Sequence, residues 1–115
     1  MIMTIYNEIE KLQATFTGTA EFDTLKKAVE EVRSDEEAKT LFVNFREVQK
    51  QLQQKQAQGE AIVEDEYLYL QKTAQLAQSN VKILAMLEAE MAMSAILEEV
   101  NRSLVEPIQS LYDGL

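Results

Sequence analysis

The chain has 115 residues, of which 46% are hydrophobic and 27% charged, and its formal net charge is −9. These proportions are ordinary for one globular domain over residues 1–115 and argue against general disorder. The negative charge disfavours direct binding to nucleic acid or anionic membranes, and no apolar run reaches the roughly 20 residues that span a bilayer. Cysteine is absent, which excludes disulfides, and the N-terminus lacks a signal-peptide pattern, so we expect a cytoplasmic protein.

The composition predicts an all-α fold of four to five helices, because helix formers are frequent and there are only one proline and three glycines. A first helix is expected from about Thr4 to Phe16, with Gly18 at its C-terminal end. Thr19 is the expected N-cap of a second helix that ends near Arg33. The apolar stripe of the first helix is formed by Ile5, Ile9, Leu12 and Phe16.

The segment Ser34–Glu37 has the pattern of a capping box, in which the Ser34 hydroxyl and the Glu37 carboxylate each accept a backbone N–H. A third helix is therefore expected from about Asp35 to Gln58. Its largely polar end, residues 49–58, is expected to project or to make few contacts. The apolar residues of this helix alternate three and four positions apart, which is the spacing of a helix that packs in a coiled coil. This apolar seam consists of Ala38, Leu41, Phe45, Val48 and Leu52.

Gly59 and the short stretch after it predict a loop between two antiparallel helices. The fourth helix is expected to begin near Glu64, where three acidic residues favour a helix N-terminus. Its stripe matches the preceding seam in length and period, which predicts a helical hairpin. That stripe consists of Tyr67, Leu70, Ala74, Ala77, Val81 and Leu84.

The remainder of the chain, residues 64–111, has two possible interpretations. No glycine or proline occurs before Pro107, yet the apolar face changes side between the two halves of this stretch. Either the helix breaks near Ser79–Asn80, or one long helix uses different partners along its length. Pro107 is expected to kink or end the last helix one turn early.

The most hydrophobic part of the chain is residues 80–112, a long C-terminal helix that one small chain is not expected to cover by itself. If the helix were continuous, about 45 residues would span roughly 68 Å, whereas a compact chain of this size is about 35 Å across. We therefore predict a dimeric helical bundle. The candidate dimer or partner interface is the stripe Ile83, Met86, Met93, Leu97, Val100, Leu104 and Ile108.

Candidate chemistry is sparse. Glu88, Glu90 and Glu98 raise the alternative of a helical bundle whose carboxylates bind a metal or a small ligand. A two-metal carboxylate bundle also needs histidines, and the chain has none, so we expect a solvated acidic face, with Glu90 as a buried structural carboxylate. Ser94 and Ser103 lack a histidine base and sit in regular helical sequence. No catalytic residue, metal or cofactor is predicted.

Two further groups have both a functional and a structural interpretation. Met86, Met91 and Met93 resemble an adaptable methionine-rich binding surface, but packing in a core or dimer is favoured. Tyr67 and Tyr69 fall on different helix faces, so at least one is expected to be exposed.

The sequence also resembles a known family. The matching segments are DEEAK (35–39), FVNFREVQ (42–49), LQQKQ (52–56) with GE (59–60), and LEAE (87–90) with MS (93–94), followed by Asn101, Pro107, Leu111 and Tyr112. Their order and spacing are similar to those of the YlbF/YmcA-like family, and in particular of its small, acidic YheA-like branch in Gram-positive bacteria. Val63 departs from that pattern, because a threonine cap is usual before this helix.

The resemblance implies a cytoplasmic, all-helical, non-enzymatic regulator that forms homodimers or larger assemblies. Better-studied members assemble with one another and with a third protein, influence RNase Y-dependent mRNA processing, and affect competence, sporulation and biofilm formation. Iron–sulfur clusters held by cysteines in some of those complexes do not carry over, because this chain has no cysteine. The expected function is a scaffold or adaptor that binds itself and other proteins.

Overall fold

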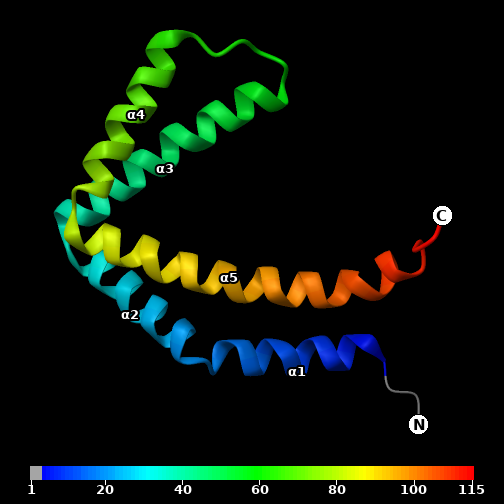
Figure 1. The fold of residues 1–115 in the computed structure, drawn as a ribbon. Helices are drawn as coiled ribbons and strands as arrows, with labels where there is room; N and C mark the ends of the chain where they lie inside the picture. Colours follow the sequence, from blue (N-terminus) through cyan, green and yellow to red (C-terminus); the bar gives the residue numbers. More distant parts are fainter. Residues whose placement is uncertain (1–3) are drawn as a thin grey trace. The chain divides into compact units, whose positions relative to one another are not determined.

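The structure is a computed structural model that describes residues 4–115, and within them the regular secondary structure is all helix, with no strand. Its elements, shown in Figure 1, are α1 (Ile5–Thr17), α2 (Ala20–Ser34), α3 (Glu36–Ala57), α4 (Glu64–Gln78) and α5 (Val81–Ser110). The predicted all-α class and the upper helix count are confirmed for this part of the chain. No described helix is both long enough and apolar enough to cross a membrane.

The chain divides into two compact units. The terminal unit consists of Met1–Lys26 with Glu88–Leu115, and the central unit is Lys27–Leu87. Both boundaries fall inside helices, α2 and α5, and not in linkers. A single domain over the whole chain stays a prediction.

Two threonines organise the start of the chain. Thr4 is the N-cap of α1, and its hydroxyl accepts the Asn7 N–H at 3.4 Å. The Thr19 hydroxyl accepts the Phe22 N–H at 3.2 Å, as predicted for the start of α2. The Phe16 and Phe22 rings lie 6.5 Å apart across the turn, so α1 and the first part of α2 share an aromatic contact.

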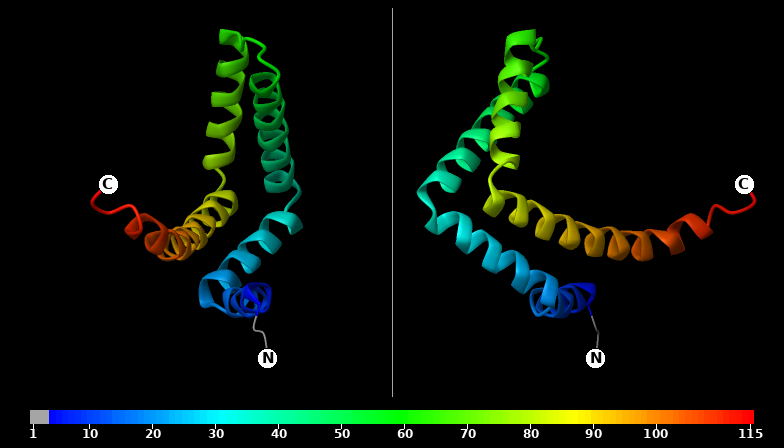
Figure 2. Two further views of the ribbon diagram at one scale, coloured as in Figure 1. Left: turned by 90° about the vertical axis from the view of Figure 1, so that its right-hand side faces the viewer. Right: turned by 60° about the vertical axis from the view of Figure 1, so that its left-hand side comes forward.

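The α3–α4 hairpin forms the body of the central unit, and both helices can be followed in Figures 1 and 2. Gly59 ends the α3 side with a φ of 75°, a left-handed conformation that glycine adopts without a steric penalty. Val48 and Leu52 are buried on α3, and Thr73 and Ala77 on α4. The predicted hairpin is therefore confirmed.

The polar end of α3 makes more contacts than the sequence predicts. Leu52 is buried, and the Lys55 ammonium lies 2.7 Å from the Glu66 carboxylate on α4. Glu66 also accepts the Val63 N–H at 3.2 Å, which is half of a capping box, since a valine side chain cannot accept the reciprocal bond. These contacts join both ends of the loop, so the prediction of a projecting, poorly connected end is wrong.

The helix breaks between α4 and α5, which decides between the two alternatives left open by the sequence. α4 ends at Gln78, and the Asn80 side-chain oxygen accepts the N–H groups of Lys82 at 3.0 Å and Ile83 at 3.1 Å. Asparagine is a good N-cap because its short side chain reaches these free donors. The chain therefore has no 45-residue helix, and the length argument for a dimer no longer applies.

This break also changes the α4 stripe. Ala77 is buried, but Tyr67, Val81 and Leu84 are exposed. Val81 and Leu84 follow the new helix start, so they no longer continue the α4 face. Thr73, which was not predicted, is buried instead and donates its hydroxyl to the Leu70 carbonyl at 2.9 Å.

The predicted capping box at Ser34 is wrong, and one of the two outcomes predicted at Pro107 is excluded. Ser34 belongs to the end of α2, and Asp35 is the N-cap of α3, with its carboxylate accepting the Ala38 N–H at 3.0 Å. Asp35 caps the helix in place of the predicted Ser34, because a charged carboxylate accepts hydrogen bonds from the helix N-terminus more strongly than a hydroxyl does. At the other end, α5 includes Pro107 and ends at Ser110. The helix continues for three residues beyond Pro107, so the proline does not end it, and the alternative of a kink stays a prediction.

Removal of the Ile83 side chain tests the core of the central unit. Ile83 has no exposed surface, so Ile83→Ala should lower the free energy of unfolding by about 2–5 kcal/mol, measured by urea denaturation. Leu84, its neighbour, is 43% exposed, and Leu84→Ala should cost clearly less. Equal losses from the two variants would contradict this assignment of the core.

Candidate interaction surfaces

The predicted interface stripe divides into a buried and an exposed part. Ile83, Met86 and Met93 are at most 4% exposed within the chain itself, so in this structure they offer no surface to a partner. The sequence could not separate these residues from the exposed ones, because a core and an interface share one periodicity. Beyond them Val100 is half-buried, and Leu97, Leu104 and Ile108 are 48%, 63% and 56% exposed. For these four residues the interface stays a prediction.

The terminal unit exposes most of its apolar side chains. α1 has no buried residue, although Ile5, Ile9 and Leu12 form the regular stripe that the sequence predicts. In α5 and the residues after it, large apolar side chains continue exposed to the end of the chain. Among the described residues of this unit, only Ala89 and Met93 are buried hydrophobics. We call the exposed residues Ile5, Ile9, Leu12, Leu97, Leu104 and Ile108, with half-buried Val100, the terminal apolar surface.

The same unit carries most of the negative charge. It contains ten acidic and three basic residues, for a net charge of −7, whereas the central unit contains ten acidic and eight basic residues, for −2. On α5 the charges avoid the apolar stripe: at 100° per residue, Glu98, Glu99 and Glu106 lie about 120° or more from Leu104. An apolar face and an acidic face therefore share one helix.

Two pockets lie along one side of the α3–α4 hairpin. The first, of about 430 Å³, is lined by Leu41, Leu76 and Val81 together with polar residues that include Asp35, Glu37 and Lys82. The second, of about 260 Å³, has the buried Val48 and Leu52 at its base and is also lined by Gln51, Asp65, Glu66 and Tyr69. Both belong to the central unit.

Lys82 connects the two helix junctions beside the first pocket. Its ammonium lies 3.0 Å from Asp35 at the start of α3 and 3.7 Å from Glu31 near the end of α2. The Ala38 N–H, and next the Lys82 ammonium, lower the pKa of Asp35 below its ordinary value. The Asp35 carboxylate in turn raises the pKa of Lys82. Both groups are therefore charged at neutral pH.

The residues considered for chemistry are dispersed. Among residues 4–115, no three acidic side chains gather where they could hold a metal ion. Glu88, Glu90 and Glu98 are all exposed. The predicted burial of Glu90 is wrong, because Ala89 and Met93 take the inward positions on α5. Metal or ligand binding by these carboxylates stays a hypothesis.

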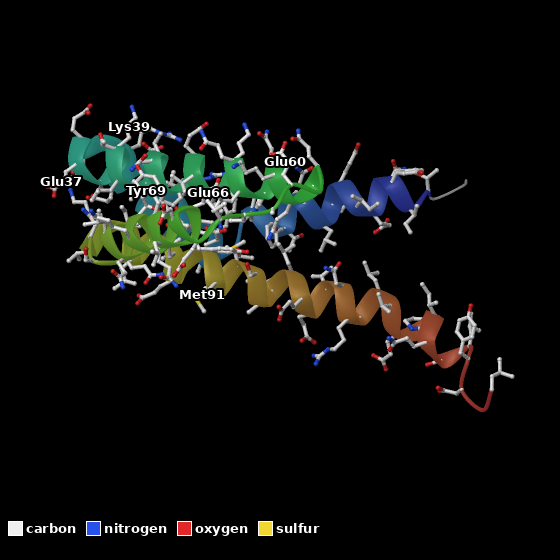
Figure 3. All side chains as sticks on the ribbon, turned by 90° about the horizontal axis from the view of Figure 1, so that it is seen from above. Glu37, Lys39, Glu60, Glu66, Tyr69 and Met91 are labelled. Atoms are coloured by element: carbon white, nitrogen blue, oxygen red, sulfur yellow. The ribbon has the colours of Figure 1, made fainter. Side chains whose placement is uncertain are left out.

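The methionines and tyrosines follow the structural interpretation. Met86 and Met93 are core residues, and Met91 alone of the three is exposed, at 71% (Figure 3). Ser94 and Ser103 lie exposed within α5. Tyr67 and Tyr69 are both exposed, which agrees with the expectation that at least one would be.

The pocket residues Tyr69 and Leu76 were not predicted as such: from the sequence Tyr69 was considered only for its exposure, and Leu76 was not singled out. They lie off the stripe that packs α4 against α3, and an isolated exposed apolar residue is common on protein surfaces. A signal was present, since the two residues are seven apart and so lie on one face of α4.

An antiparallel helical hairpin, in a chain whose described secondary structure is all helix, defines a protein of the all-α class. Comparisons with known proteins agree with the fold. Residues 5–109 match the family described as "Control of competence regulator ComK, YlbF/YmcA", and the chain belongs to this family.

Its relatives are similar over their full length. The chain is 55% identical over 114 residues to a UPF0342 protein of Lysinibacillus sphaericus, covering 99% of both chains. It is 41% identical to the UPF0342 protein YheA of Bacillus subtilis, over 100% of this chain and 98% of the relative.

Two solved structures share the fold. A protein of unknown function (DUF964) from Bacillus stearothermophilus superposes with a TM-score of 0.88 at 33% identity, over 96% of this chain and 97% of the other. YheA from Bacillus subtilis gives a TM-score of 0.75 at 34% identity, over 96% and 100%. The suggested YlbF/YmcA-like, YheA-like identification is thus confirmed.

The pKa of Asp35 can be tested by NMR titration of its side-chain carboxyl. We expect a midpoint below the ordinary value, and Lys82→Met should raise it part of the way, since the Ala38 N–H remains. Because the folded-state pKa lies below the unfolded one, the stability from this carboxylate is present above the unfolded pKa and is lost as pH falls through the folded one. Lys39→Met is the control, and an equal shift in both variants would refute the role of Lys82.

Proposed function

We propose that this protein is a non-enzymatic, cytoplasmic helical scaffold that forms a homodimer and binds other proteins. The observation that carries the proposal is the terminal apolar surface, which the unit's own small core leaves uncovered. Exposed apolar patches of this kind mark association sites in proteins. The family's description, control of a competence regulator, supports a regulatory role, and RNA processing or developmental control (competence, sporulation, biofilm formation) are the processes we favour.

The dimer is expected to be isologous, with the same surface used by both copies. α1 has 13 residues and spans about 20 Å, and the part of α5 from Leu97 to Ser110 spans about 21 Å. Apolar segments of matched length from two copies can cover one another from end to end. The three-and-four spacing on both helices is the spacing that interlocking helices use.

Charge sets a limit on the strength of this dimer. Each terminal unit has a net charge of −7, so two copies repel one another at low ionic strength. The acidic residues of α5 named above lie away from the stripe, which keeps the repulsion indirect and open to screening by salt. Dimerisation should therefore strengthen between about 50 and 300 mM salt, unlike an association held by ion pairs.

A charge placed on the stripe tests the dimer. Leu104→Asp should raise the dimer dissociation constant roughly 100-fold, equivalent to about 3 kcal/mol, because it removes apolar burial and places a carboxylate in the interface. Analytical ultracentrifugation measures the change. Ala95→Asp adds the same charge about 180° away on α5 and should leave the constant within a few-fold.

Two results would refute the proposal. The first is a wild-type protein that stays monomeric at all concentrations and salt conditions. The second is a dimer that Leu104→Asp and Ala95→Asp weaken equally, which would place the interface elsewhere.

A further inference from the structure

Two pockets follow one side of the α3–α4 hairpin. Leu41 and Val48 are seven residues apart on α3, and Tyr69 and Leu76 are seven apart on α4, so each pair lies on one helix face. The two helices run antiparallel, which places Leu41 beside Leu76 in the first pocket and Val48 beside Tyr69 in the second. We call this surface the hairpin groove. Figure 3 labels Tyr69 and Glu66 on α4 and Glu37 near the start of α3.

The spacing of the two pockets matches a helix. Seven residues correspond to two helical turns, so the pockets are about 10.5 Å apart along the hairpin. A third helix laid in the groove would present side chains at positions i and i+7 with the same separation, and each would enter one pocket. Volumes of about 430 and 260 Å³ are large enough for apolar side chains.

The groove also exposes apolar side chains that a partner would cover. Tyr69 is 51% exposed, Leu76 46% and Val81 81%. Val48 and Leu52 at the base of the second pocket are already buried, so the hairpin is complete without these three residues. Their exposure has no role in holding α3 against α4.

The residues that line the two pockets carry more negative than positive charge, although Lys72 lies on the same face of α4 between Tyr69 and Leu76. Asp35 and Glu37 line the first pocket and Asp65 and Glu66 the second, whereas Lys82 is the one cation among the residues described as lining them. Lys82 is paired with Asp35, and Lys55 on α3 is paired with Glu66. Glu37 and Asp65 therefore remain to attract positive charge.

We propose that the hairpin groove binds a basic, amphipathic helix of a different protein, with apolar anchors at i and i+7 and lysines or arginines beside them. A second copy of this chain fits less well. Its exposed apolar helices belong to the terminal unit, whose net charge is −7, and the acidic groove would repel them. This inference names the partner class of the proposed scaffold, and it rests on that function.

Site-specific photo-crosslinking in the native host tests the groove. A photoreactive phenylalanine replaces Tyr69 or Leu76 in the full-length protein, and mass spectrometry maps the segment that each position captures. Tyr67 is the matched control, because it is also an exposed tyrosine but lies about 160° around α4 from Tyr69. We expect positions 69 and 76 to capture one basic helical segment at sites two turns apart, and position 67 not to capture it.

The captured segment, made as a peptide, then allows a binding measurement. The double variant Glu37→Lys, Asp65→Lys should weaken binding at least tenfold, and raising the salt from about 50 to 300 mM should weaken it in the wild type. Glu60→Lys, Glu64→Lys makes the same charge change outside the two pockets and should have little effect.

Several outcomes would overturn the inference: no adduct from positions 69 and 76, capture of the same segment from position 67, or capture of an acidic segment, a second copy or RNA. Ultracentrifugation of the same variants separates this failure from that of the scaffold. If the protein dimerises but positions 69 and 76 form no adduct, the groove proposal alone is overturned. If the wild-type protein forms no dimer, the proposed function is overturned.

Discussion

The unequal distribution of apolar burial between the two units is the constraint on which the rest of this structure depends. Among residues 4–115, seven of the nine buried hydrophobic residues belong to the central unit, where α3 and α4 pack together and Ile83 has no exposed surface. The described part of the terminal unit contributes only Ala89 and Met93, yet it carries regular apolar stripes on α1 and α5. Because the hydrophobic effect favours covering such stripes, their exposure is the basis of the proposed contact with another chain.

Local signals in the sequence were sufficient to predict most of the fold. The predicted helix ends at Thr19, Gly59 and the acidic start of α4 agree with the structure to within about a residue. The hairpin was predicted because the apolar stripes of its two helices have the same length and period. Errors arose where two signals competed. Asp35 displaced Ser34 as a cap. Asn80 starts a new helix within residues 64–106, which contain no glycine or proline, so only the structure could decide between one helix and two.

The interaction surfaces were harder to predict, because periodicity identifies an apolar face but not what covers it. Leu104 and Ile83 belong to one predicted stripe, yet one is 63% exposed and the other fully buried. Tyr69 and Leu76 are only two residues on one face of α4, too few to predict an apolar stripe. The structure adds that they line pockets together with Val48 and Leu41 on α3. Together the two proposals assign the exposed apolar stripes of the terminal unit to a second copy of the chain, and the hairpin groove to another protein.

Hydrogen–deuterium exchange across a range of protein concentrations is the most direct test that a second copy covers the terminal unit. Helix α1 buries no residue within its own chain, so its amides should be protected at high concentration and lose that protection on dilution, together with those of α5 beyond Leu97. The α3–α4 hairpin should remain protected throughout. Protection of α1 that does not change with concentration would contradict the account.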